Sequence, residues 1–252
     1  MAQSWKDIAF ATKEVDGNHF LATVRTLLLD ALEYHHGRDS AASAIRQGRS
    51  AVANADTAFG TTMNTTEVVR PALERIDDSL SRPLPVDRSQ RETVRKEVID
   101  TLLTVIARIG DGSNLILDPD LDSYYVMDAV ILKLPALVDQ VGRIADLTRG
   151  ALAMTDVPFE RKAAFLILRG ELVATLNGLS NTLESGYRGN ADGSLQQSLG
   201  TPFTALYDAL KPFLTALDTV LRDDTAARPD ATTIESLRER VQVTADTLYK
   251  AA

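Results

Sequence analysis

Apolar residues recur every three or four positions along almost the whole chain, and this spacing is the strongest constraint that the sequence places on the fold. Residues spaced in this way lie on one face of an α-helix, whereas a strand requires alternation, which no segment shows convincingly. The sequence therefore predicts an all-α protein. Its clearest helix begins near Asp230 and has an apolar face made of Ile234, Leu237, Val241, Ala245 and Leu248.

Capping residues mark where two further helices begin. Ser89 and Glu92 have the spacing of a capping box, which predicts an amphipathic helix over about 88–110. Asp118 followed by Pro119 is a typical helix start, because the carboxylate caps the first turn and proline suits the first helical position. A long third helix is expected to follow.

Glycine and proline residues set the expected breaks between the other helices. A helix is expected over about 155–186, and the segment over about 195–223 contains two prolines, so it should begin late or bend. Residues 39–80 also have a helical pattern, with a predicted break at 60–62 and a kink at Pro71. Helices of these lengths predict an elongated antiparallel bundle.

The apolar stripe of the opening segment changes sides near Gly17. Ile8 and Val15 lie on one helical face, whereas the apolar residues over 20–31 lie on nearly the opposite face at about 100° per residue. One explanation is a helix break at 17–18. The other is a continuous helix that packs against different partners along its length, which would suit two stacked modules.

Composition narrows the class of protein. Of 252 residues, 44% are hydrophobic and 25% are charged, which is typical of a soluble globular protein. The formal net charge of −8 repels nucleic-acid phosphates and anionic lipids, so no nucleic-acid role is expected. The longest apolar run, over 129–138, is interrupted by Lys133, so no membrane-spanning helix is expected within the chain.

Motifs of enzymes and metal sites are missing from the sequence. It contains no cysteine, no phosphate-binding glycine loop, no His-Glu-x-x-His and no Gly-x-Ser-x-Gly motif. His35 and His36 lie near Glu33 and Asp39, but adjacent helical residues point about 100° apart and do not converge on one metal ion. We therefore expect a protein that is not an enzyme and that carries no cofactor or metal.

The densest polar cluster begins with Asp118, Asp120 and Asp122, a pattern that imitates a calcium-binding loop. The pattern fails at the sixth position, which is Ser123 and not glycine, and at the twelfth, which is Ala129 and not glutamate. The first aspartate is expected to cap a helix, and the next two to lie near the positive end of its dipole.

Asp128 is the candidate for a binding role in this region. It shares a predicted helical face with Leu121, Tyr125, Leu132 and Pro135 and should point inward, where a carboxylate needs partners or a ligand. Two roles for Asp128 are therefore open: a structural hydrogen-bond network with Tyr124 or Tyr125, and a ligand site. Acidic groups favour an amine, whereas the helix N-terminus favours an acid. The candidate ligand-binding residues are Asp122, Tyr124, Tyr125 and Asp128.

Two stretches of the sequence resemble one known class of protein. Residues 114–128, followed by Lys-Leu-Pro at 133–135, are similar to a recurring motif of all-helical sensor domains in bacterial transmembrane receptors. Residues 6–17 resemble the first periplasmic helix of the same receptors. At its length, the chain resembles the helical bimodular type, in which two stacked four-helix modules share long helices. The sequence does not mark the boundary between the modules.

The resemblance implies a single extracytoplasmic sensor domain over 1–252, the periplasmic part of an inner-membrane receptor with transmembrane helices on both sides. The output of such a receptor is a histidine kinase or a chemotaxis domain. A small organic acid or amine would bind between helices and shift one of them by about 1–2 Å, and the receptor would be a homodimer. The alternative is a cytosolic helical scaffold that recruits a protein partner through an exposed groove.

Overall fold

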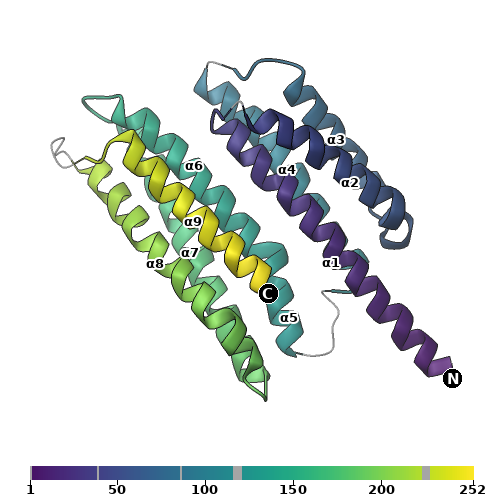
Figure 1. Ribbon diagram of the computed structural model, residues 1–252. Helices are drawn as coiled ribbons and strands as arrows, with labels where there is room; N and C mark the ends of the chain where they lie inside the picture. Colours follow the sequence, from purple (N-terminus) through teal and green to yellow (C-terminus); the bar gives the residue numbers. More distant parts are fainter. Residues whose placement is uncertain (1, 39, 86, 116–120, 223–227) are drawn as a thin grey trace. The chain divides into compact units, whose positions relative to one another are not determined.

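The computed structural model describes residues 2–38, 40–85, 87–115, 121–222 and 228–252, with the exception of the side chains of 2–7, 88–89 and 121–123. Within these residues every regular element is a helix and no strand occurs, which confirms the all-α prediction (Figure 1). The chain divides into two compact units, residues 1–119 and 120–252. Each described helix belongs to one unit, whereas the sequence predicted modules that share long helices.

The first unit contains four described helices. They are α1 (Ala2–His35), α2 (Ala41–Met63), α3 (Thr66–Leu80) and α4 (Arg88–Gly112). Helix α1 packs against α2 and α4, and α3 packs against α2 and α4. Their apolar faces meet in a core that includes Phe20, Val24 and Leu27 of α1 and Val105 and Ile109 of α4.

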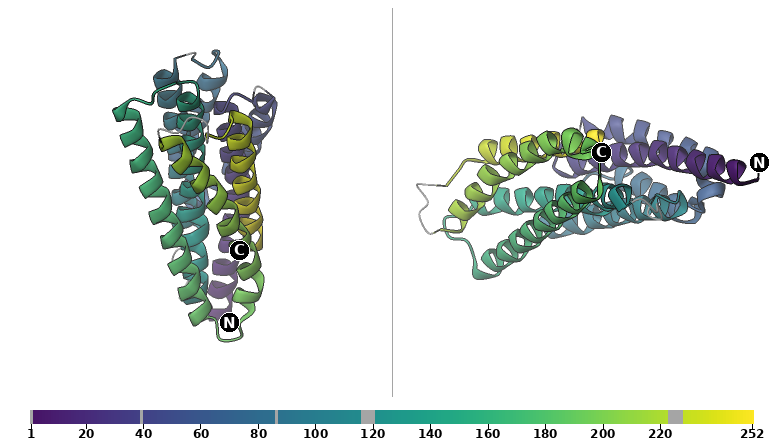
Figure 2. Two further views of the ribbon diagram at one scale, coloured as in Figure 1. Left: turned by 90° about the vertical axis from the view of Figure 1, so that its left-hand side faces the viewer. Right: turned by 90° about the horizontal axis from the view of Figure 1, so that it is seen from below.

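The second unit is built from four helical segments of the described chain, one of which contains a π turn. Its elements are α5 (Leu121–Asp128), the π turn (Ala129–Lys133), α6 (Leu134–Leu152), α7 (Phe159–Gly189), α8 (Ser194–Leu221) and α9 (Ala231–Ala251). Helix α7 packs against α5 and α6, and α9 packs against α6 and α8. Figure 2 shows α8 and α9 side by side in two further views.

Helix α1 runs unbroken through Gly17, so the predicted break at 17–18 is wrong and the alternative of a continuous helix is confirmed. A Cβ atom added at Gly17 would lie 2.2 Å from the Cβ of Ser113, the residue that ends α4. Glycine at this position therefore allows α1 and the end of α4 to approach closely, and it does not terminate the helix.

The break between α2 and α3 lies later than the sequence predicted. Helix α2 continues through 60–62, and the chain turns at Asn64, whose φ of 55° is left-handed. Asparagine adopts this conformation more readily than most residues, which makes it a suitable helix end. Gly60 is instead a contact point, because an added Cβ would lie 2.3 Å from Asp56 Oδ1, which accepts a hydrogen bond from Thr65 Oγ1 at 2.7 Å.

Capping explains where α4 and α9 begin. The Gln90 amide donates to Asp87 Oδ1 at 3.0 Å, so Asp87 caps α4 and the predicted capping box at Ser89 is wrong. The predicted start of α9 is confirmed, because the Thr233 amide donates to Asp230 Oδ1 at 2.6 Å. That backbone hydrogen bond lowers the pKa of Asp230 below its ordinary value.

Helix α8 begins at Ser194, ahead of both of its prolines, so of the two predicted alternatives, a late start and a bend, the late start is excluded. Helix α7 is long and apolar enough to cross a membrane by length and composition, although the sequence predicted no such helix; its most apolar 18-residue window has a mean hydropathy of 1.2. This is weak evidence of a span, because the core helices of soluble proteins meet the same criteria.

Candidate functional site

A π turn interrupts the helical segment that the sequence predicted as one regular helix. Helix α5 ends at Asp128, the π turn occupies the next five residues, and α6 follows directly. Such a turn holds one more residue than an α-helical turn, so side chains after it face a different direction from the one that a 3.6-residue period predicts. Leu132 was predicted to face inward with Asp128 but is 51% exposed, because it lies in this turn.

The carboxylate of Asp128 is held by two partners from different elements. Its side chain is 20% exposed, and Oδ2 accepts a hydrogen bond from the Thr182 hydroxyl of α7 at 2.8 Å. The same oxygen forms an ion pair with the ammonium group of Lys133, at the end of the π turn. Asp128 therefore links the π turn to α7.

The backbone of the π turn explains why these groups meet. Residues five apart point about 140° away from each other on a regular α-helix, whereas a π turn brings them toward the same side. Lys133 then passes over Gly178 of α7, where an added Cβ would lie 3.3 Å from Lys133 Cε. Gly178 and Thr182 lie on one face of α7 because they are four residues apart. We call Asp128, Lys133, Gly178 and Thr182 the Asp128 cluster.

Two aromatic rings lie on α5 one turn before the Asp128 cluster. Tyr124 is exposed and Tyr125 is half-buried, and their ring centroids are 5.4 Å apart in an edge-to-face arrangement. Among the described residues neither tyrosine forms a hydrogen bond with Asp128, so the predicted network with a tyrosine is replaced by one with Lys133 and Thr182. The side chain of Asp122 and all of Asp118 and Asp120 lie outside the described residues.

The region presents chemical groups of the kind that a small-molecule site would use. It presents a carboxylate, an ammonium group and a hydroxyl group beside two phenol rings, which together suit a small molecule with an ionised group. The sequence identified the aspartate and the tyrosines. It missed Thr182, because no local pattern connects two residues 54 positions apart.

A pocket lies within the first unit. Helices α3 and α4 and the connection between them enclose a cavity of about 270 Å³. Its polar lining includes Arg75, which donates to Glu97 at 2.7 Å, and the buried hydroxyl of Ser79, which has no partner within the described residues. No sequence motif predicts this pocket. Its apolar lining consists of Pro83, Leu84, Pro85, Val94 and Val98.

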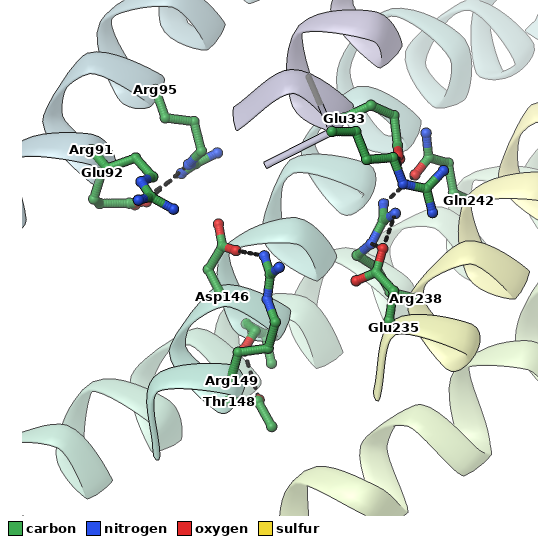
Figure 3. Close-up of polar contacts among 12 residues, drawn as sticks. Glu33, Arg91, Glu92, Arg95, Asp146, Thr148, Arg149, Glu235, Arg238 and Gln242 are labelled. Carbon is green, nitrogen blue, oxygen red and sulfur yellow. Dashed lines mark hydrogen bonds and ion pairs between the residues drawn. The ribbon is translucent and has the colours of Figure 1, made fainter. Parts of the chain in front are cut away.

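Two arginines of the described helices are buried in the helical cores. Arg95 of α4 donates to Glu92 at 2.9 Å, and Arg238 of α9 donates to Glu235 at 2.7 Å, each within one helix (Figure 3). Gln242 also accepts a hydrogen bond from Arg238 at 2.5 Å. A buried guanidinium group requires such partners, so these contacts are consistent with a structural role.

The region formed by α5, the π turn and α7 is thus the candidate ligand site, and it contains the predicted residues Tyr124, Tyr125 and Asp128. The geometry of this region and the resemblance of two sequence stretches are the two observations that support a function. No protein-family model matches the chain, and no curated protein or solved structure shows significant similarity to it.

Proposed function

We propose that this chain is the periplasmic ligand-binding sensor domain of a bacterial inner-membrane receptor, either a sensor histidine kinase or a chemoreceptor. The single observation that carries the proposal is the π turn next to the aromatic pair of α5. Turns of this kind are rare and occur frequently at functional sites. Here the π turn carries one half of an ion pair, and the paired carboxylate is held by a neighbouring helix.

The arrangement of helices supports the same proposal. Each of the two units contains four helical segments of the described chain, which agrees with the resemblance to receptors built from two four-helix modules. The proposed receptor would carry transmembrane helices on both sides of this chain. It would signal by binding a ligand, without catalysis in this segment.

The π turn also suggests how binding would become a signal. If the π turn converts into an α-helical turn, one residue leaves the turn, and α5 moves relative to α6 by about 1.5 Å, the rise of one residue. Helix shifts of about 1–2 Å are typical of signalling transitions. A ligand that favours one of the two arrangements would move the equilibrium toward it.

The Asp128 cluster offers a polar partner to either ligand class, an organic acid or an amine. An organic acid would compete with Asp128 for the ammonium group of Lys133, and an amine would compete with Lys133 for the carboxylate. Either ligand would break the ion pair that the π turn holds. The aromatic pair of α5 would supply the apolar part of the site.

A screen of thermal stability against organic acids and amines tests this proposal. A ligand at about 100 times its dissociation constant should stabilise the chain by about 2.7 kcal/mol and raise its melting temperature. Tyr125→Ala should abolish that rise, whereas Tyr207→Ala, a change at an exposed tyrosine of α8, should preserve it. A panel without a stabilising compound, or a ligand whose effect survives in Tyr125→Ala, would argue against the proposal.

A further inference from the structure

The outer face of helix α7 exposes large apolar side chains. Phe159 is 79% exposed, Leu166 is 60% exposed and Ile167 is 63% exposed, whereas Phe165 and Leu168 on the opposite face are buried. Only 28% of the most apolar 18-residue window of this helix is buried. Exposed apolar residues that gather on one helix face mark a surface for interaction.

Six residues of this face, of which four are exposed and two are half-buried, follow the spacing of a helix that packs against another helix. Steps of four and three residues alternate along the face, as they do along the contact seam of a coiled coil. We call this set the α7 stripe: Phe159, Ala163, Leu166, Gly170, Val173 and Asn177.

Gly170, in the middle of the α7 stripe, also indicates that a second helix packs there. Glycine destabilises the interior of a helix relative to alanine, so an interior glycine usually has a packing reason. A Cβ atom added at Gly170 would have nothing within 4 Å, so the described structure of this chain gives no such reason. A second helix that lies against the α7 stripe would approach the backbone closely at this point.

The charges beside the α7 stripe indicate which partner it takes. At about 100° per residue, Lys162 and Arg169 lie along one edge of the stripe, and Glu160 and Glu171 lie along the other. Two parallel copies of α7 related by a two-fold axis bring the basic edge of each copy beside the acidic edge of the other. An antiparallel pair would bring like charges together, which is unfavourable.

The same charges disfavour a lipid partner. Arg169 forms an ion pair with Asp218 of α8, with Arg169 Nε 2.7 Å from Asp218 Oδ1, and both side chains are partly exposed beside the middle of the stripe. Charged groups at this depth are costly in a bilayer, whereas a polar rim around an apolar centre is the usual anatomy of a protein interface.

We propose that the α7 stripe is a homodimer interface, on which a second copy of this chain packs its own α7 in a parallel arrangement. The Asn177 side chains of the two copies would lie opposite each other, and a polar residue at such a position fixes the register of the pair. The stripe covers fewer than three heptads, so the dimer should be weak. The proposal does not depend on the sensor function.

Single cysteines test the parallel arrangement directly, because the chain contains no cysteine of its own. Ala163→Cys and Asn177→Cys should each form a covalent dimer on mild oxidation, since every residue of the stripe meets its own copy across a parallel two-fold axis. Val243→Cys, at an exposed apolar position of α9, is the matched control and should form no covalent dimer. Cross-linking at only one stripe position, or at neither, would overturn the proposal.

Sedimentation equilibrium from about 1 µM to about 1 mM tests the strength of the interface. Leu166→Glu should weaken dimerisation at least about tenfold, which corresponds to about 1.4 kcal/mol, while Val243→Glu should leave it unchanged. Both positions are exposed, so both variants should keep the helical circular dichroism of the unchanged chain. A strictly monomeric chain that instead binds phosphatidylcholine vesicles through α7 would contradict the proposal. Ligand binding at α5 would be unaffected by that outcome.

Discussion

Replacing Gly112 with alanine is expected to lower the stability of the first unit by about 1–3 kcal/mol, the usual cost of inserting a methyl group where there is no room. The new Cβ would lie 2.1 Å from the carbonyl oxygen of Met63 and 2.9 Å from its carbonyl carbon. These are backbone atoms at the end of α2, so they cannot move aside as a flexible side chain can. The better helix propensity of alanine offsets at most about 1 kcal/mol.

The matched control is Gly200→Ala in α8. Its added Cβ would lie 3.9 Å from the nearest neighbouring atom, Gln196 Cγ, which is an ordinary contact distance. This variant should gain about 0.4–1 kcal/mol from the loss of glycine flexibility in the unfolded chain. Urea denaturation should therefore move the midpoints of the two variants in opposite directions. A Gly112→Ala variant as stable as the unchanged chain would show that the close contact between α4 and α2 is absent.

Substitution of Asp128 is expected to have the second large effect. Asp128→Ala would leave the partly buried ammonium group of Lys133 without this partner and remove the acceptor of the Thr182 hydrogen bond. We expect the free energy of unfolding to fall by about 1–3 kcal/mol, the cost of leaving a partly buried polar group unsatisfied. Thr182→Val removes only the hydrogen bond and should cost about 1 kcal/mol.

Asp128→Asn distinguishes the structural role of this residue from a binding role, because it preserves the shape of the side chain and removes its charge. If Asp128 contacts the ligand, the loss of binding free energy measured by calorimetry should exceed the loss of folding free energy measured from the melting of the free protein. If it only anchors the π turn, the order should be reversed. Asp208→Asn, in an exposed ion pair with Lys211 of α8, is the control and should change neither quantity appreciably. Unchanged affinity in Asp128→Asn would remove Asp128 from the site.

Local patterns predicted most of the fold but not the function of its glycines. The start of α9 was correct because a capping aspartate and the apolar period agree within a few residues. A break was predicted at Gly60 and was one of two alternatives at Gly17, yet both glycines lie inside helices where neighbouring atoms approach closely. The sequence shows that a residue is glycine, but whether it serves a turn or a close contact depends on which elements pack together.

The candidate site was predictable only in part, for a related reason. Tyr124, Tyr125 and Asp128 stood out because aromatic and acidic residues gather in one short segment. The π turn was not predictable from the apolar period, which assumes 3.6 residues per turn. Lys133 and Thr182 become partners of Asp128 only through that turn and through the packing of α7 against α5.

A ligand that binds beside the π turn should change the packing of this turn, and amide hydrogen exchange of the whole chain would detect that change. Exchange would be compared with and without the compound that stabilises the chain most in the thermal screen. We expect protection to change in α5, the π turn and the part of α7 near Gly178 and Thr182, because breaking the ion pair between Asp128 and Lys133 alters these segments. Unchanged exchange in these segments, or changes confined to residues 1–119, would contradict this expectation.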